Sequence, residues 1–503
     1  MTKTTRRHFL GQAFAGATAF ACGRSVWAAV DSPKPTTNVL FIAVDDLRPQ
    51  LGCYGDKVVK SPNLDRLAAD GTVFTRAYCQ QAVCSPSRTS LLTGRRPDTT
   101  LVYDLETHFR KTIPDVVTLP EQFKREGYHA QGLSKLYHGG LDDAQSWSVP
   151  WWKPEAQTYH LPQNVTDLAK RTAEAQAAGV KPSQIGRWPR GVPTEAPDIA
   201  DNELADGKTA DRAIEVLNAI KGGPFFLGVG FLKPHLPFIA PKKYWDLYPR
   251  DQLSLADNPF APKDCPQYAL TNWGELRHYV GVPKVGPLSD EQALELIHGY
   301  YACASYTDAQ IGRVVDALER LGLRDNTVIV VWGDHGWQLG EHGLWCKHTN
   351  FETSVHAPLI CSAPKQKTRG VSCDALVEFV DIYPSMCELC GVPLPDGLEG
   401  ASFAPLLDEP ARPWKTAAFS QYPRYVDGVG RIMGYSMRTD RYRLTEWRGL
   451  EKDFTEYELY DHETDPKENV NIAQRPENAA LVKQLAAQLQ AGWRAALPPG
   501  AIS

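Results

Sequence analysis

Cys84 lies where a helix is expected to begin, in the segment VCSPSRTSLLTG that spans residues 83–94. Proline is favoured in the first turn of a helix and glycine just after the last turn, so Pro86 and Gly94 predict its two ends. The N-terminus of a helix attracts anions, and Arg88 lies one turn further on, on the same face. A thiol in this setting is a candidate low-pKa nucleophile, and a purely structural cysteine is the alternative.

Charged side chains and histidines follow four expected strands, each at the point where the strand ends. Open α/β sheets place their functional sites at the carboxyl ends of the strands. A solvated loop explains one such pair of residues well, but it explains four pairs together poorly. The residues are Asp45 and Asp46, Lys135 and His138, Lys233 and His235, and Asp334 and His335.

The three aspartates of this set predict a site for a divalent cation. Three carboxylates at one edge of a sheet would repel one another without a cation, and oxygen ligands of this kind suit Ca²⁺. His335 fits calcium less well, because imidazole suits softer metals. The alternative for Asp45 and Asp46 is a helix N-cap with its neighbour.

The elements that must position these residues alternate along the chain. An uninterrupted apolar run over residues 38–44 predicts a buried strand of a parallel sheet. Strands that alternate with helices predict an α/β fold, with a large, mostly parallel mixed sheet covered by helices. Further strands are expected at 129–133, 224–231 and 326–332, with helices at 61–71, 118–127 and 291–322.

Two regions depart from this alternation. Residues 146–193 hold four tryptophans among many prolines and predict an irregular excursion over the sheet, whose aromatic rings could stack on a sugar or simply pack. A Pro/Gly-rich connector then leads into several short strands and a closing amphipathic helix, 477–497. We therefore expect a catalytic domain over 36–395 and a smaller C-terminal α+β domain with an antiparallel sheet over 396–503.

The N-terminal 28 residues are typical of an export signal of the twin-arginine type. Arg6 and Arg7 precede a short apolar run, and small residues lead up to Ala28. This predicts export by the twin-arginine (Tat) machinery of a bacterium to a periplasmic or secreted location, with no integral membrane segment in the mature protein. A disordered basic tail and a lipid-modified Cys22 are the alternatives.

Composition adds two limits. A formal net charge of -5 gives no sign of a nucleic-acid partner, so an anionic substrate must be held by a local cluster of cations. Cys387 and Cys390 form a CxxC pattern within a helical periodicity. Two small core residues one turn apart are favoured over a redox pair there.

The string from Cys84 to Arg88 resembles the C-x-P-x-R signature of the formylglycine-dependent sulfatases. Other segments resemble elements of that family in the same order: VDDLRPQLGCYG, SKLYHGG, KPHLPF and GDHGWQLGEHGLWCKHTNFE. The similarity covers residues 38 to about 465, and its details are similar to the subgroup that acts on a 2-O-sulfated uronic acid. The resemblance implies an alkaline-phosphatase-like fold and sulfate-ester hydrolysis.

The resemblance also assigns roles. Cys84 would be oxidised to formylglycine by a formylglycine-generating or anaerobic sulfatase-maturating enzyme that recognises Pro86 and Arg88. One Ca²⁺ would be bound by Asp45, Asp46, Cys84, Asp334 and His335, the last of which replaces an asparagine common in the family. The catalytic set would be Cys84, Arg88, Lys135, His138, His235 and Lys347. In it, His138 would act as the base that releases sulfate, and His235 or Lys347 as the acid.

The expected substrate is a sulfated saccharide, with a 2-O-sulfated uronic acid favoured over other algal or host glycans. Lys347, Arg95, Arg96 and the tryptophan-rich region are candidates for reading the sugar, and a solvated surface is the alternative for the two arginines. Two other functions stay open. One is a phosphate mono- or diester hydrolase of the same superfamily, and the other is an inactive glycan-binding protein in which Cys84 is never matured.

Overall fold

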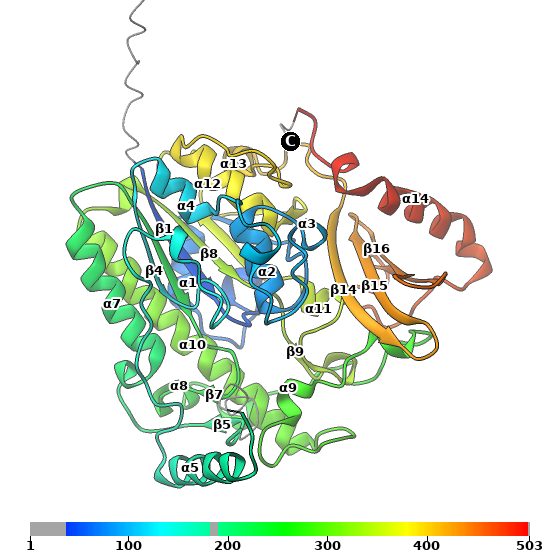
Figure 1. Cartoon of the computed structure of the whole chain (residues 1–503), viewed down its shortest axis with the longest axis horizontal. Helices are drawn as coiled ribbons and strands as arrows, with labels where there is room; N and C mark the ends of the chain where they lie inside the picture. Colours follow the sequence, from blue (N-terminus) through cyan, green and yellow to red (C-terminus); the bar gives the residue numbers. More distant parts are fainter. Residues whose placement is uncertain (1–36, 182–189, 501–503) are drawn as a thin grey trace, which may run out of the picture. The chain divides into compact units, whose positions relative to one another are not determined.

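The computed structural model describes residues 37–181 and 190–500, so the expected export segment 1–28 lies outside the described residues. Its central sheet has seven strands in the order β12-β2-β11-β8-β1-β6-β4 (Figure 1). Neighbouring strands are parallel except where β11 runs against β8 and β2. The predicted mixed, mostly parallel sheet is therefore confirmed. The strands are β1 (Asn38–Val44), β2 (Thr72–Phe74), β4 (His129–Ser134), β6 (Phe225–Phe231), β8 (Thr327–Gly333), β11 (Leu359–Ser362) and β12 (Val371–Cys373).

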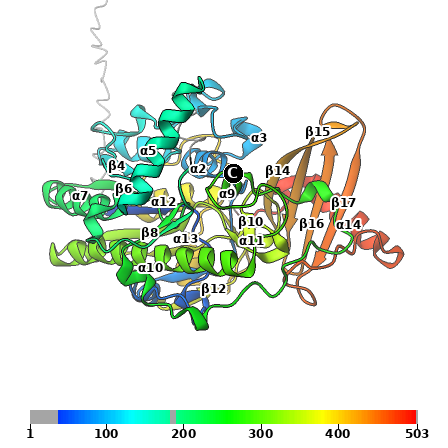
Figure 2. The same cartoon turned by 90° about the horizontal axis from the view of Figure 1, so that it is seen from below.

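Alternate side chains of β1 enter two hydrophobic cores, one on each face of the sheet. Leu40 and Ile42 belong to one core, and Val39 and Phe41 belong to the other. The first core includes residues of α1 (Pro62–Ala69), α7 (Ala205–Ile220) and α10 (Asp290–Arg320), and the second includes residues of α2 (Cys84–Thr93), α4 (Leu119–Arg125) and α12 (Ile382–Cys390). Figure 2 shows the long helix α10 alongside β8. No helix in the described part of the chain is long and apolar enough to cross a membrane.

Helix α2 has the limits that its sequence predicts. It begins at Cys84, after Val83 in extended conformation (φ -158°), and ends before Gly94, which adopts a left-handed conformation (φ 65°). Every residue of the helix is buried. The N-terminus of α2 is therefore held rigidly inside the protein.

The region 146–193 is not wholly irregular, contrary to the prediction. It contains α5 (Pro162–Ala177), a 16-residue helix that starts with proline in its first turn. Among its described residues only Ala175 is buried. The prediction was wrong because a high proline content does not exclude a helix: proline in the first turn is compatible with an alanine-rich helix.

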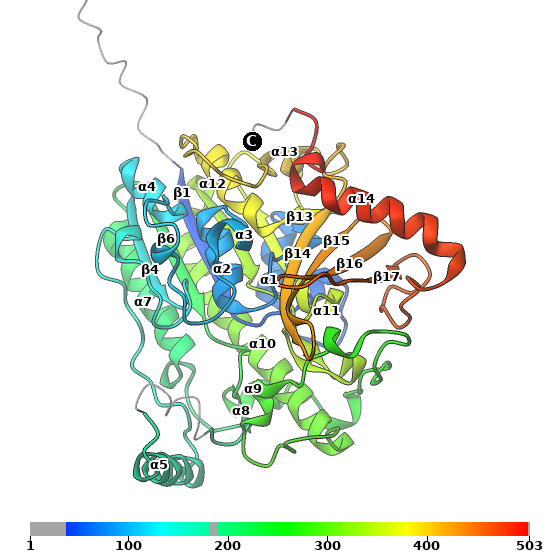
Figure 3. The same ribbon diagram turned by 45° about the vertical axis from the view of Figure 1, so that its right-hand side comes forward.

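The C-terminal part of the chain forms an antiparallel meander, as predicted, and Figure 3 shows α14 (Ala479–Ala495) alongside it. Leu485 and Leu489 of the helix pack against Met437, Leu444 and Leu459 of the sheet. The strands are β14 (Ala418–Val426), β15 (Gly430–Arg438), β16 (Tyr442–Gly449) and β17 (Thr455–Asp461). The expected boundary near residue 395 stays a prediction, and both sheets belong to one compact unit of the described chain.

Cys387 and Cys390 are buried in α12 and form no disulfide. Both belong to the core on the α12 face of the sheet. The interpretation as two core residues is the one that the structure supports.

Gly230, the penultimate residue of strand β6, lies against the backbone of Lys135. A Cβ atom at residue 230 would lie 2.2 Å from the Lys135 carbonyl oxygen and 2.7 Å from its backbone nitrogen. We expect Gly230→Ala to lower the free energy of unfolding by about 1–3 kcal/mol, because backbone must shift to make room. Urea denaturation measures the change. Gly222→Ala is the control, since a Cβ there meets nothing within 4 Å, and equal stability of the two variants would contradict the prediction.

Candidate active site

The carboxyl ends of four parallel strands bring the predicted residues to one edge of the sheet. Asp45 and Asp46 directly follow β1, and Asp334 directly follows its neighbour β8. The Asp46 backbone, in a left-handed conformation (φ 60°), donates a hydrogen bond to Asp334 Oδ1 at 3.0 Å. Lys135 follows β4, and His235 lies in the loop after β6. Residues almost 300 positions apart in the chain meet here because β1 and β8 are adjacent parallel strands that end at the same level.

Cys84 lies inside this cluster, with 2% of its surface exposed. Its Sγ is 3.5 Å from Asp45 Oδ1, 3.4 Å from His335 Nε2 and 3.9 Å from Lys135 Nζ. Burial and the charge of Asp45 raise the pKa of the thiol well above its usual value. The unmodified thiol is therefore protonated at neutral pH and is a poor nucleophile, contrary to the expectation of a lowered pKa at the helix N-terminus.

Arg88 joins the two strand ends from within the protein. Its Nε donates to Asp334 Oδ2 at 2.8 Å, and its Nη2 donates to Asp45 Oδ1 at 3.1 Å. Nη1 donates to the backbone carbonyl of Leu136 at 3.0 Å. The guanidinium also lies over the ring of Trp332, 5.5 Å from its centroid. With no exposed surface, Arg88 fixes the separation of the two carboxylates.

Two lysines neutralise the carboxylates from the side of the cavity. Lys135 forms an ion pair with Asp45, and Lys347 Nζ lies 3.0 Å from Asp46 Oδ1. Burial alone would lower the pKa of Lys135, but the charge of Asp45 outweighs burial and raises that pKa to about 12. Both ammonium groups are therefore charged at neutral pH and can donate hydrogen bonds to an anion.

Glu275 is a member of the site that sequence reasoning missed. This residue of α9 (Gly274–Arg277) places Oε1 3.0 Å from His235 Nε2 and Oε2 2.9 Å from Lys347 Nζ. Burial would raise its pKa, but Lys347 and His235 hold that pKa well below the usual value. The carboxylate is therefore ionised and orients both side chains. No signal in the sequence marks it, because α9 is short and follows no predicted strand.

The cluster opens into a cavity of about 730 Å³. Cys84, Asp45, Lys135, His138, His235 and Lys347 line it, together with Glu275, Trp151, Lys153, Arg190 and His278. Four of the predicted residues, Asp46, Arg88, Asp334 and His335, are buried behind this wall. All ten predicted site residues are therefore brought together.

Only some of the residues that were candidates for contacting the sugar line this cavity. Lys347 and Trp151 line the cavity, whereas Arg95 and Arg96 do not. Arg96 is buried and makes two hydrogen bonds to Glu378, at 2.7 and 2.8 Å. Trp188 lies outside the described residues.

His138 lies in the wall of the cavity, and its buried Nδ1 has no hydrogen-bond partner in the described part of the chain. Burial and the nearby Lys135 lower its pKa from 6.5 to about 3. The unfolded chain therefore binds more protons than the folded protein between these values, so this contribution to stability is complete above pH 6.5 and is lost as the pH falls toward 3.

We expect the His138 imidazole to stay neutral down to about pH 4, because a proton on it would be buried beside Lys135. The measurement is an NMR pH titration of protein with ¹³C-labelled histidine. His138→Gln identifies the signal, since the substitution removes that resonance alone. Titration of the assigned signal near pH 6.5 would contradict the prediction.

This combination of sheet, cysteine-headed helix and carboxylate cluster defines a hydrolase of the sulfatase class. The sulfatase family model matches residues 37–392, and the model for the N-sulphoglucosamine sulphohydrolase C-terminal region matches residues 340–494. The chain belongs to the sulfatase family and is a sulfuric ester hydrolase, as the resemblance implied.

Named relatives span nearly the whole chain. Iduronate 2-sulfatase of Mus musculus is 33% identical, over 90% of this chain and 94% of that protein. Iduronate 2-sulfatase of Homo sapiens is 34% identical, over 88% and 92%. A sulfatase of Formosa agariphila is 30% identical, over 93% and 88%. The expected similarity to the iduronate 2-sulfatase subgroup is confirmed.

Solved structures agree in fold. A phosphonate monoester hydrolase of Agrobacterium radiobacter has a TM-score of 0.72 at 23% identity, over 91% of this chain and 95% of that one. A 2-O GAG sulfatase has a TM-score of 0.69 at 22% identity, over 91% of each chain. At these identities the likeness shows the alkaline-phosphatase-like fold, which confirms the predicted fold class.

Proposed function

We propose that this protein removes the sulfate group from a sulfated saccharide, with a 2-O-sulfated uronic acid as the substrate. The proposal includes oxidation of Cys84 to formylglycine and one bound Ca²⁺. The observation that carries it is the position of Cys84 Sγ, within 3.5 Å of Asp45 and His335, in a cavity that is also lined by Lys135 and Lys347, two lysines that can bind an anion.

The residues around Cys84 fit a calcium ion. Asp45, Asp46 and Asp334 supply carboxylate oxygens from adjacent strand ends, which is the donor type that Ca²⁺ prefers. The ligand atoms of Asp45, Asp46, Cys84 and His235 lie within 4.8 Å of one another, as do those of Cys84, Asp334 and His335. Calcium bound there would supply Lewis-acid stabilisation of negative charge.

Residue 84 supplies the nucleophile in this proposal. As the hydrate of formylglycine it would offer two hydroxyl groups on one carbon, which a thiol with a raised pKa does not. Arg88 keeps Asp45 and Asp334 at a fixed separation around it. Helix α2 holds the residue at its buried N-terminus, so little motion is needed before reaction.

Lys135 and Lys347 face the cavity as permanent cations that would bind the sulfuryl oxygens. His235 lines the cavity with its Nε2 3.0 Å from Glu275 Oε1, and in this proposal it donates a proton to the leaving alkoxide. His138 lines the same cavity, and its lowered pKa keeps it unprotonated at neutral pH, so it can accept a proton. The two histidines therefore divide the acid and base roles.

The names of the relatives and the charge of the cavity support a uronic acid. Arg190 and Lys153 line the cavity beyond the catalytic cluster. Arg190 donates to the Tyr279 hydroxyl at 2.9 Å and pairs with no described carboxylate within ion-pair distance. A sugar that carries a carboxylate in addition to its sulfate ester suits this second positive region.

A phosphate or phosphonate ester hydrolase is the second candidate, favoured by the structural likeness to the phosphonate monoester hydrolase. Three aspartates make one cation site, whereas two-metal phosphatases need more acidic ligands.

We also propose maturation by a formylglycine-generating or anaerobic sulfatase-maturating enzyme, followed by twin-arginine export to the periplasm or beyond.

The test is a desulfation panel, run with protein whose residue 84 has been checked by peptide mass. The panel holds 2-O-, 6-O- and N-sulfated disaccharides with and without a uronic acid, choline sulfate, an aryl sulfate and a phosphonate monoester. We expect kcat/KM to be highest, by at least about tenfold, on the 2-O-sulfated uronic acid, a difference of 1.4 kcal/mol in transition-state binding. Higher kcat/KM on the phosphonate ester than on any sulfate would overturn the proposal.

A further inference from the structure

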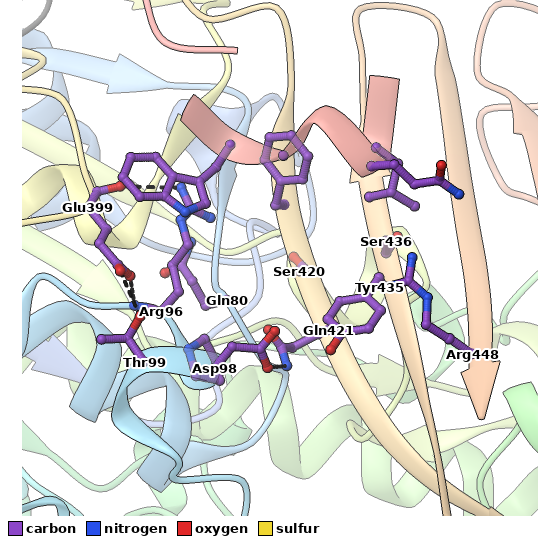
Figure 4. A pocket seen from close by; sticks show the side chains of 16 residues that line it. Gln80, Arg96, Asp98, Thr99, Glu399, Ser420, Gln421, Tyr435, Ser436 and Arg448 are labelled. Carbon is purple, nitrogen blue, oxygen red and sulfur yellow. Dashed lines mark hydrogen bonds between the residues drawn. The ribbon is translucent and has the colours of Figure 1, made fainter. Parts of the chain in front are cut away.

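A second cavity, of about 520 Å³, lies where the C-terminal sheet and α14 meet the loop that follows α2 (Figure 4). Arg96 lines it from the loop that follows α2, Asp98 and Thr99 line it from the short helix α3 (Pro97–Thr100), and Gln421 and Tyr435 line it from β14 and β15. It shares no lining residue with the catalytic cavity. Its volume is in the range of small-molecule sites, which is about 300–1,000 Å³.

Aromatic rings and guanidinium groups make up much of its wall. Gly492, at φ 76°, breaks the helical course of α14 just before Trp493. The Arg96 guanidinium lies 5.1 Å from the Trp493 ring centroid and 5.7 Å from that of Phe419. Arg448 lies 5.3 Å from the ring of Tyr435. Flat rings held in place by cations offer rigid faces on which the C–H surface of a ring-shaped ligand can pack.

The polar groups of this cavity are rich in hydrogen-bond acceptors. Gln80 is 1% exposed, and its Oε1 accepts no hydrogen bond in the described part of the chain. A buried acceptor without a partner is unfavourable, so Gln80 is poised to accept a hydrogen bond from a ligand. Asp98 Oδ1 accepts from Gln421 Nε2 at 2.7 Å and from the Tyr103 hydroxyl at 2.9 Å, and a carboxylate can accept further hydrogen bonds at its second oxygen.

The charges of the lining residues balance. Arg96 and Arg448 are matched by Asp98 and Glu399, and Arg96 is further neutralised by its two hydrogen bonds to Glu378. A highly charged anion finds no unpaired buried cation here. A ligand with an apolar ring face and several O–H donors suits aromatic walls, carboxylates and an amide oxygen without a partner.

We propose that this cavity is a non-catalytic saccharide site that binds one sugar unit of a glycan chain while another unit lies in the catalytic cavity. This inference rests on the proposed function for the kind of chain that is bound. Two contacts on one chain would raise the effective concentration of the substrate at the catalytic site. Long chains would then be bound more tightly than disaccharides, with no change in the chemical step.

The experiment compares Tyr435→Ala with wild type on a 2-O-sulfated glycosaminoglycan octasaccharide and on the matching disaccharide. We expect KM for the octasaccharide to rise about tenfold, while kcat and the disaccharide KM stay unchanged. Tyr425→Ala is the matched control, because Tyr425 is an exposed tyrosine of β14 that does not line the cavity. An unchanged octasaccharide KM in Tyr435→Ala would overturn the inference.

Gln80→Leu is a second variant that separates loss of saccharide binding from loss of folded stability. It removes an acceptor that lacks a partner and one long hydrogen bond, from Gln80 Nε2 to Glu378 Oε1 at 3.5 Å, so a structural role alone predicts a small change in melting temperature and an unchanged octasaccharide KM. The saccharide site predicts a higher KM with no loss of stability.

Failure of the proposed function can be recognised separately. If the wild type hydrolyses no sulfated saccharide, octasaccharide binding to the Cys84→Ala protein, measured by calorimetry and weakened by Tyr435→Ala, would still support the site. Binding of equal strength with and without Tyr435→Ala would overturn it.

Discussion

Cys84→Ala protein is expected to lose sulfate-ester hydrolysis by about 10⁴-fold or more, because the residue that becomes the nucleophile is gone. The surrounding groups are held by contacts that do not involve the thiol. Arg88 bonds to Asp45 and Asp334, and Lys347 bonds to Asp46 and Glu275. The variant should therefore keep its melting temperature within a few degrees. The measurement is kcat/KM on the best sulfated disaccharide of the panel, together with thermal denaturation.

The control is Cys387→Ala, which removes a buried thiol from α12 outside the site. It should retain activity, although it loses some stability from the cavity that it creates. Peptide mass spectrometry of active wild-type protein should find residue 84 as the aldehyde or its hydrate. An active preparation in which residue 84 is entirely thiol would refute the assignment of the nucleophile. An inactive wild type with an unmodified thiol and good glycan affinity would favour the glycan-binding alternative.

Asp45→Asn is the second large effect that we expect. Asp45 contacts Cys84, Arg88 and Lys135, so its charge serves both the proposed cation and the two basic residues. We expect activity to fall by at least about 10³-fold, the scale seen when one preorganised electrostatic group is removed. We also expect the stabilisation of the folded protein by calcium to be strongly reduced. Calcium at one hundred times its Kd should stabilise wild-type protein by about 2.7 kcal/mol and the variant by much less.

The second readout does not depend on turnover, so it separates binding of the cation from chemistry. Asp381→Asn is a matched control: Asp381 is a buried carboxylate that pairs with Lys415 at 2.6 Å outside the site. It should lose stability in the absence of calcium but keep the calcium-dependent increase in melting temperature. An equal increase in Asp45→Asn and wild type would show that Asp45 is not a ligand.

Most of the fold was predictable because the periodicity and the ends of a helix or strand depend on residues that are close together in the sequence. The apolar run of β1, the ends of α2 at Cys84 and Gly94, and the C-terminal meander all follow from residues near one another in sequence. Parallel strands also place their carboxyl ends together, which is why the polar residues after β1, β4, β6 and β8 could be expected to meet.

The sequence by itself determined the class of the protein, the residues of the cluster and the sheet edge that holds them. Only the tertiary structure decided that Glu275 binds His235 and Lys347, that Arg96 turns away to Glu378, and that the Cys84 thiol has a raised pKa. The physical reason is that these properties depend on burial and on contacts between distant segments. Such contacts arise only when side chains pack, and neither spacing nor residue type reveals them.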